Sequence, residues 1–271
     1  MIRFYSWFLV FLIAFVFLGE MAYSVSPYEL NPNKILQPPS FEHLMGTDRL
    51  GRDILARIIE GGKTSLIIGF LSAMITSLIG LFIGINAGYF KGNIDKGITI
   101  LIDLFLTFPT FFLLLALVSY IDASIFVLII ILSITGWMSI ARLIRSESFA
   151  IGNKPYIKIL KLANVKNSKI IFKYFAPLLA PIFLVSFTFG VGGAILAESG
   201  LSFLGLGINP PQMSWGTILS DGKDVIDIAW WISFFAGFFI FLVTYCLVQI
   251  SDYIQHKANT KDVQQASCIK N

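Results

Sequence analysis

The fold is decided by residues 64–88, which read TSLIIGFLSAMITSLIGLFIGINAG. This stretch holds no charged residue and exceeds the roughly 20 apolar helical residues that cross a bilayer core about 30 Å thick. Working outward from it, five further apolar runs of similar character occur along the chain. The sequence therefore predicts an all-α membrane protein with six transmembrane helices over residues 4–23, 64–88, 98–119, 124–141, 176–196 and 228–250.

The composition excludes the other broad classes of protein. Hydrophobic residues make up 56% of the 271 residues and charged residues 13%, against roughly 25% charged in ordinary soluble chains. Such apolar runs exclude a disordered chain and lack the alternation of barrel strands. The cysteines, Cys246 and Cys268, and the histidines, His43 and His256, have no disulfide or metal-site spacing. Nothing in the composition indicates nucleic-acid binding.

Lysine and arginine in short loops predict the orientation in the membrane. Residues 142–175 carry eight basic residues against one acid, Glu147, and are expected in the cytoplasm. Alternating outward, both termini fall inside and residues 25–63 fall outside. The first run, with Arg3 before it and small residues after it, also resembles a cleaved signal peptide. The expected parts are 1–24, a first transmembrane helix; 25–63, an extracytoplasmic segment; 64–250, a five-helix core with the cytoplasmic loop 142–175; and 251–271, a cytoplasmic tail.

The extracytoplasmic segment is expected to contain a short amphipathic helix within residues 43–60, lying at the membrane surface. Thr47 or Asp48 could cap it, because a side-chain oxygen at that position accepts a hydrogen bond from the first free amides. Residues four apart would form its two faces. These are Leu50, Ile54 and Ile58 on the apolar face, and Arg49, Asp53 and Arg57 as helical ion pairs.

Small residues and one proline predict how the spans pack. Gly80, Gly84 and Gly88 are four residues apart, a spacing that lets a second helix approach closely in lipid. Packing within the chain is favoured over a dimer contact. Pro109 removes a backbone donor and should kink the third span.

Two acids in or near the spans are candidates, with Pro109, for the translocation pathway or its gate. Asp103 lies near the inner end of the third span and Glu198 at the outer end of the fifth. Ionisable groups at such positions are functional hypotheses by default. Both are expected near an interface, and simple snorkelling of the carboxylate to water is the interpretation that the sequence favours.

The cytoplasmic segment 152–175 is too polar to span the membrane, and it is long for a simple connection. Its lysines recur every three to five residues, and Tyr156, Ile159, Leu160 and Ala163 give its first part an apolar side. Asn164 interrupts this pattern, and asparagine tolerates the left-handed backbone of a helix end. We expect two short helices joined near Asn164. A docking site for a cytosolic partner and a basic segment that merely fixes topology both remain open.

Three motifs carry a resemblance to a known family. They are GTDRLGRD at 46–53, DLFLTFP at 103–109, and ILAESGLSFLGLGINPP at 195–211, followed by SWG at 214–216. With these motifs nearly the whole chain resembles the membrane subunits of ATP-binding-cassette importers, in the dipeptide, oligopeptide and nickel permease family. The type with the GTDxxGRD motif is the one it resembles. Its extracytoplasmic motif residues would be Gly46, Thr47, Asp48, Gly51, Arg52 and Asp53.

The resemblance implies the type I importer permease fold and a set of partners. These would be a second homologous permease, two cytosolic ATPase subunits and an extracytoplasmic solute-binding protein. ATP and magnesium would bind to the ATPases, so this chain would hold no cofactor and would not be an enzyme. Gly62-Lys63-Thr64 is not a phosphate loop, because Arg57 stands where the first glycine is required.

The resemblance also implies that residues 156–177 dock on the ATPase. The sequence departs from the family here, with Lys158-Ile159-Leu160 in place of Glu-Ala-Ala and Asn164 in place of glycine. The reversed charge implies a divergent ATPase partner or altered coupling. The candidate coupling residues are Tyr156, Lys158, Ile159, Leu160, Lys161, Asn164 and Pro177.

The function implied is that of a subunit of an ATP-driven importer in the inner membrane of a bacterium. It would form half of the pathway for dipeptides, oligopeptides or nickel, free or complexed. A stand-alone channel, a secondary transporter and a permease with weakened ATPase coupling are the alternatives.

Overall fold

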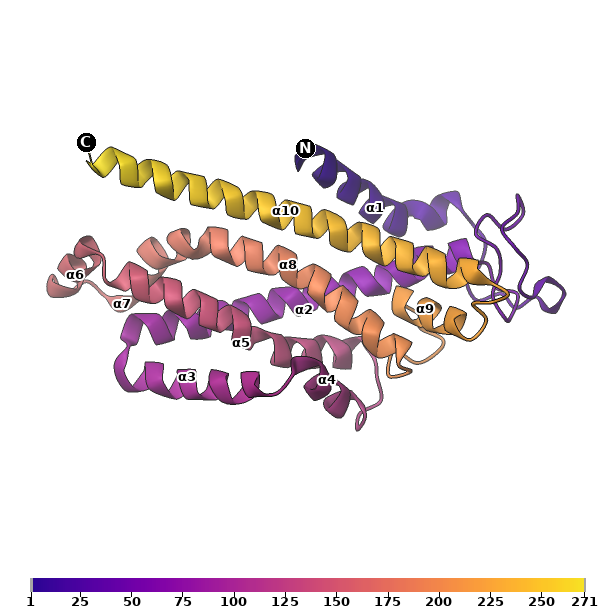
Figure 1. Ribbon diagram of the computed structural model, residues 1–271, viewed down its shortest axis with the longest axis horizontal. Coiled ribbons are helices and arrows are strands. Elements are labelled where there is room, and N and C mark those ends of the chain that lie inside the picture. The colour runs from indigo at the N-terminus through magenta and orange to yellow at the C-terminus, as the bar shows by residue number, and fades with distance from the viewer. Residues whose placement is uncertain (1, 271) are drawn as a thin grey trace.

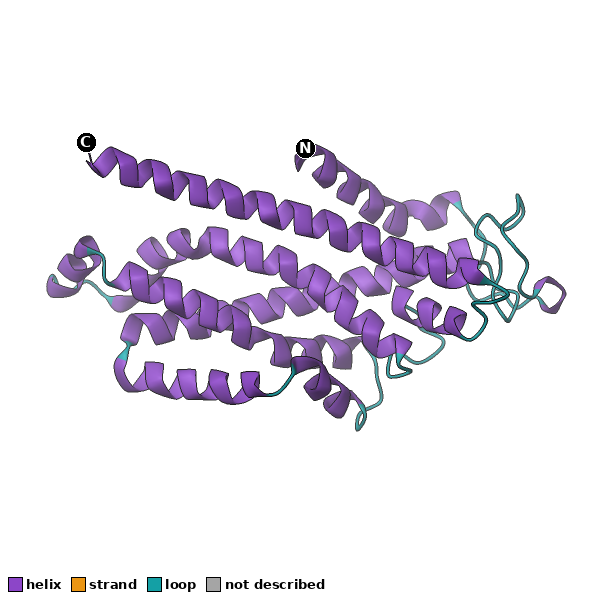
Figure 2. Cartoon of the chain, viewed as in Figure 1, coloured by secondary structure: helices purple, strands orange, loops and turns teal. Residues whose placement is uncertain are grey.

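The computed structural model describes the backbone of residues 2–270 and the side chains of residues 2–258. The chain is a bundle of helices along one long axis, joined by loops (Figures 1 and 2). The side chains of Lys261, Cys268 and Lys270, in the expected tail, lie outside the described residues. The helices are α1 Ile2–Ala22, α2 Ile54–Phe90, α3 Gly92–Thr107, α4 Thr110–Val118, α5 Ile125–Gly152, α6 Pro155–Leu162, α7 Asn167–Ile170, α8 Ala176–Phe203, α9 Trp215–Lys223 and α10 Trp230–Lys270, with a 3₁₀ turn at Pro32–Lys34 and a π turn at Ile171–Phe175.

The expected six-span fold is confirmed. Five helical segments are long and apolar enough to cross a membrane, and α3 and α4 together supply a sixth. Several helices extend beyond the predicted spans, because backbone hydrogen bonding continues a helix past the edge of the membrane. We call the end that carries α6, α7 and the α2–α3 turn the hairpin end, and the end that carries α9 and residues 23–53 the loop end (Figure 1).

The long helix α2 packs closely along α5, as the glycine spacing predicts. A Cβ atom on Gly84 would lie 2.7 Å from the carbonyl oxygen of Ala141, and one on Gly88 would lie 2.5 Å from Cβ of Ser148. Such distances leave no room for a side chain, so glycine is required for the two backbones to approach this closely. The groove is thus used within the chain.

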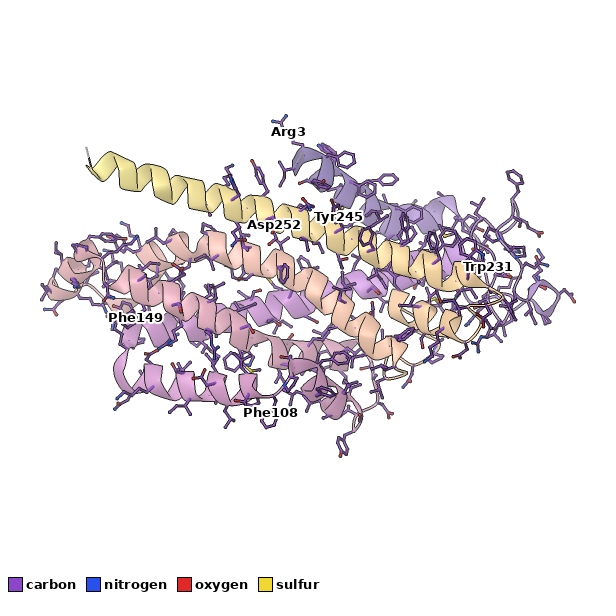
Figure 3. All side chains as sticks on the ribbon, in the orientation of Figure 1. Arg3, Phe108, Phe149, Trp231, Tyr245 and Asp252 are labelled. Atoms are coloured by element: carbon purple, nitrogen blue, oxygen red, sulfur yellow. The ribbon has the colours of Figure 1, made fainter. Side chains whose placement is uncertain are left out.

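The third span is broken at Pro109, where the sequence predicts a kink. α3 ends at Thr107, α4 starts at Thr110, and the two axes differ by 79°. Phe108, at the break, lies at the surface of the bundle (Figure 3). Ion pairs from Arg145 to Asp95 and from Arg142 to Asp103 hold α3 along α5.

The amphipathic helix expected within residues 43–60 is wrong in its bounds and in its cap. Residues 43–53 form loop structure, and helix starts only at Ile54, as the first turn of α2. The N-cap is Asp53, whose carboxylate accepts a hydrogen bond from the amide of Ala56 at 2.9 Å. Thr47 and Asp48 lie instead in the loop, where Gly46 and Gly51 have positive φ angles that a helix cannot accommodate.

The close approach of α2 and α5 predicts that Gly84→Leu will destabilise the protein. Overpacking typically costs about 1–3 kcal/mol, and the new side chain would meet backbone that cannot move aside. Thermal unfolding in detergent should show a clear drop in Tm. Gly97→Leu is the matched control, because a Cβ atom on Gly97 meets nothing within 4 Å. An equal effect of both substitutions would contradict the packing argument.

Candidate functional site

At the hairpin end, two short helices project from the bundle (Figure 1). Pro155 occupies the first turn of α6, where its missing amide costs no hydrogen bond. Asn164 has φ +54°, and the amide of Val165 donates to the carbonyl of Leu160 at 3.1 Å, which closes the helix. The predicted pair of helices joined by a left-handed Asn164 is confirmed. We call residues 154–175 the hairpin.

The hairpin has one buried and one exposed side. Ile157, Ile170 and Phe175 are fully buried and pack together with the ends of α2, α5 and α8. On the other side, Ile159 and Leu162 are 64% and 83% exposed. These apolar side chains lie open while the base of the hairpin is fixed in the core.

The predicted apolar side of α6 is therefore only partly right. Leu160 packs against the core cluster, but Tyr156 and Ile159 point outward, because Ile157 takes the inward position. Lys158 is exposed beside them and Lys161 reaches back to α2, with its ammonium 4.0 Å from the ring centroid of Tyr89. The remaining candidate, Pro177, is exposed in the first turn of α8.

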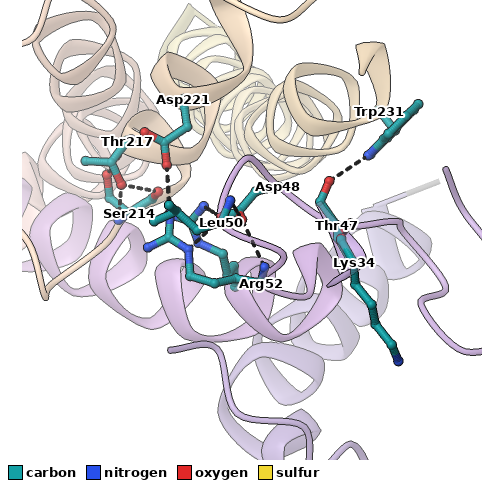
Figure 4. A network of polar contacts seen from close by, with 10 residues as sticks. Lys34, Thr47, Asp48, Leu50, Arg52, Ser214, Thr217, Asp221 and Trp231 are labelled. Carbon is teal, nitrogen blue, oxygen red and sulfur yellow. Dashed lines mark hydrogen bonds and ion pairs between the residues drawn. The ribbon is translucent and has the colours of Figure 1, made fainter. Parts of the chain in front are cut away.

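At the loop end, the 46–53 motif is a buried connection between elements. A Cβ atom on Gly51 would lie 1.9 Å from the carbonyl oxygen of Asn31, so this position excludes any side chain. Thr47 is fully buried. Its carbonyl accepts a hydrogen bond from the indole of Trp231, in the first turn of α10, at 3.1 Å (Figure 4).

The charged residues of the motif form a buried network, in place of the predicted helical pairs. The carboxylate of Asp48 accepts hydrogen bonds from the Arg52 Nε at 2.6 Å and the Arg57 Nη1 at 2.5 Å. Arg57 also donates to Asp221 of α9 at 2.9 Å (Figure 4). Arg49 pairs with Asp224 instead of Asp53. Removing one partner of such a network strands a buried charge, which costs about 3–5 kcal/mol.

Asp53 joins the start of α2 to two further segments. Besides capping α2, its carboxylate accepts the Tyr23 hydroxyl at 2.8 Å and lies 2.9 Å from Nδ1 of His43. Burial, and then the hydrogen bond to this carboxylate, raise the pKa of Tyr23, so its hydroxyl stays protonated and keeps donating. The motif thus holds the loop before it, the end of α1 and the start of α2 together.

Glu198 lies in the interior of the protein, and the predicted snorkelling of its carboxylate to water is wrong. Its side chain is fully buried in α8. Its Oε1 accepts hydrogen bonds from Ser202 at 2.7 Å and from Ser214, the N-cap of α9, at 2.6 Å. Hydroxyls of Ser65 and Ser199 also face it, and none of these four neighbours is charged. Glu198 ties α9 to α8 rather than reaching water.

A cavity of about 360 Å³ lies between α2, α4, α5 and α8. Neither Asp103, which pairs with Arg142, nor Pro109 nor Glu198 lines it, although Pro109 places the first residue of α4, Thr110, at its wall. The residues that sequence reasoning missed are hydroxyl-bearing. Two pairs of them, four residues apart on α2 and α5, are the signal that could have revealed this face. Its hydroxyl residues are Ser72, Thr76, Thr110, Thr135, Ser139 and Ser186.

The burial of Glu198 predicts different effects for two substitutions. Glu198→Ala leaves the Ser202 and Ser214 hydroxyls without their acceptor, at a cost of about 1–3 kcal/mol per unsatisfied group, so Tm should fall. Glu198→Gln keeps an acceptor oxygen and should lower Tm less than Glu198→Ala does. Thermal unfolding in detergent checks this, with the exposed Glu147→Ala as control. Equal stability of Glu198→Ala and the unsubstituted chain would contradict the assignment.

Comparisons with known proteins agree with this architecture. A family model described as "Binding-protein-dependent transport system inner membrane component" matches residues 77–260. The oligopeptide transport system permease protein OppC of Haemophilus influenzae is 32% identical over 256 residues, covering 94% of this chain and 82% of that protein. The dipeptide transport system permease protein DppC of Alkalihalophilus pseudofirmus is 38% identical over 239 residues, covering 88% of this chain and 78% of that protein.

Solved structures show the same fold. A chain of the inward-facing MetNI methionine ABC transporter superposes with a TM-score of 0.58 at 14% identity, covering 73% of this chain and 96% of that chain. The fold is that of type I ABC importer permeases. Because the family model covers more than half of the chain, the protein is a multi-pass inner-membrane protein that belongs to the family of binding-protein-dependent inner-membrane transport components, the permease subunits of ABC importers.

Proposed function

We propose that this chain is the transmembrane subunit of an ATP-driven peptide importer and forms half of its translocation pathway with a second, homologous permease. The relatives reported above are named as oligopeptide and dipeptide permeases, which favours peptides over the nickel cargo that the sequence left open. Both termini and the hairpin end lie in the cytoplasm, as the excess of basic residues in 142–175 indicates.

The observation that carries the proposal is the exposed side of α6. Ile159 and Leu162 are large apolar residues left open at the tip of a segment too polar to lie in lipid. Neighbouring exposed apolar groups mark protein or membrane interaction sites, and the polarity of this segment favours a protein partner. Lys158 lies beside them and makes no ion pair among the described residues. The hairpin therefore docks on a cytosolic ATPase, which binds ATP and magnesium, and this chain catalyses no reaction.

The six serine and threonine residues of the cavity, set in an otherwise apolar lining, support a peptide pathway. Serine and threonine hydroxyls both donate and accept hydrogen bonds, so they can exchange partners with the amides of a passing peptide without selecting its side chains. The cavity holds no charged lining residue, which suits cargo of varied charge. At the loop end, an extracytoplasmic solute-binding protein delivers the peptide and selects it.

Docking of the hairpin predicts a cross-linking pattern. A photoreactive amino acid at position 158 of the assembled transporter should capture an ATPase subunit, because this position is exposed on the docking side of α6. Phe41 is the matched control, since it is fully exposed in the outer loop at the other end of the bundle. Capture of the ATPase from position 41, or none from position 158, would overturn the proposed orientation.

The proposed cargo predicts an uptake pattern. Cells that lack this subunit should lose uptake of labelled dipeptides or oligopeptides and keep uptake of nickel. The purified chain alone should hydrolyse no ATP, and hydrolysis should appear only with the ATPase subunits. Loss of nickel uptake with peptide uptake unchanged would contradict the proposal and show that nickel is the cargo.

A further inference from the structure

One side chain of α2, Tyr89, connects the hairpin to the rest of the bundle. It lies in the last turn of α2 and is 2% exposed. Two residues later Lys91 has φ +57° and turns the chain into α3. Tyr89 therefore lies where a movement of the hairpin would reach the α2–α3 turn.

Each segment of the hairpin contacts Tyr89. From α7, Asn167 accepts a hydrogen bond from the Tyr89 hydroxyl at 2.7 Å. From α6, the Lys161 ammonium lies 4.0 Å from the ring centroid and donates to the Tyr89 carbonyl at 3.3 Å. From the π turn, the ring of Phe175 packs edge-on, with centroids 5.3 Å apart. Three successive segments of the hairpin thus share one contact residue.

The Lys161 ammonium contacts Tyr89 at the C-terminal end of α2, where a positive charge is favourable. The last carbonyls of α2 carry the negative end of the helix dipole, which favours a cation there. The ring face adds a cation–π attraction. Partial burial, and then the nearby Lys91, lower the pKa of Lys161.

A second lysine fixes the other side of the same turn. The ammonium of Lys91 donates to Asn153, just after α5, at 2.8 Å and lies 4.0 Å from the ring centroid of Phe149. Phe149 lies on α5 toward the hairpin end (Figure 3). The α2–α3 turn is therefore held between α5 and the hairpin. α3 starts from this turn, and the broken span continues from α3 to the cavity wall at Thr110.

We infer that Tyr89 is a positioning residue that transmits displacement of the hairpin to the α2–α3 turn, and through α3 to the break at Pro109. The inference rests on the proposed function, since it takes the hairpin as the part that the ATPase moves. It adds the residue and the route by which that movement reaches the cavity. The ring and the hydroxyl serve different segments, so the two contributions can be removed one at a time.

The test uses the assembled transporter in liposomes and measures peptide transported per ATP hydrolysed. Tyr89→Phe removes only the hydrogen bond to Asn167 and should lower this ratio by about five-fold, the factor that about 1 kcal/mol represents. Tyr89→Leu also removes the ring and should lower the ratio further. In both variants, ATPase capture from position 158 should persist, because docking uses the opposite side of α6.

Tyr174→Phe is the matched control. It makes the same Tyr-to-Phe change within the hairpin itself, at a half-buried tyrosine whose hydroxyl has no hydrogen bond among the described residues. Its ratio of peptide to ATP should stay unchanged. If Tyr89→Leu does not assemble, Tyr89→Phe combined with Asn167→Ala decides the question, since two residues that act through one bond give losses that do not add.

The results separate this inference from the function on which it rests. Capture from position 158 together with an unchanged ratio in the Tyr89 variants overturns the inference and leaves the proposed function intact. An equal loss in Tyr174→Phe and Tyr89→Phe also overturns it, because the effect would not be specific to Tyr89. Absence of capture in the unsubstituted transporter overturns the proposed function, and the inference with it.

Discussion

The rest of the bundle depends on how closely α2 can approach α5. In lipid, two apolar helices gain little free energy from the hydrophobic effect when they pack together, because the lipid chains are as apolar as the side chains. Dispersion contacts between the backbones must hold them, and these contacts weaken within a fraction of an ångström. Gly80, Gly84 and Gly88 satisfy this condition by placing no side chain at the three positions where α2 meets α5 most closely. The ion pairs of α3 with α5 and the core of the hairpin are built on that pair of helices.

The sequence predicts the parts of this fold that follow from local chemistry. Hydropathy locates the spans because a helix satisfies every polar backbone group of an apolar segment within lipid. Gly84, Pro109 and Asn164 predict the groove, the break and the left-handed turn because each acts through its own backbone. The Glu198 environment could not be predicted in this way. Its acceptor role depends on Ser214, which follows a separate turn after α8 and is brought back only by the tertiary fold.

The 46–53 motif also shows that local spacing predicts less than the tertiary fold determines. Residues four apart favour helical ion pairs, yet Asp48 pairs with Arg57 across a loop and Arg49 pairs with Asp224. The positive φ angle of Gly51 excludes the helix that the spacing suggested. In the hairpin, the repeating apolar positions predict two helices correctly but not which side of α6 is buried. Ile157 is buried in the cluster at the ends of α2, α5 and α8, and the spacing within α6 does not encode that choice.

The two polar ends of the molecule are joined by a single continuous helix. α2 carries Arg57 in its first turns and Tyr89 in its last, over 37 residues, which at about 1.5 Å per residue is about 55 Å. At the loop end it is bonded to the 46–53 motif and α9, and at the hairpin end to the hairpin. A helix transmits displacement along its axis because its hydrogen bonds resist stretching, whereas the α3–α4 span is already broken. Under the proposed function, movement of the hairpin would reach the α2–α3 turn through Tyr89, and the broken α3–α4 span would yield at Pro109, next to Thr110 at the cavity wall.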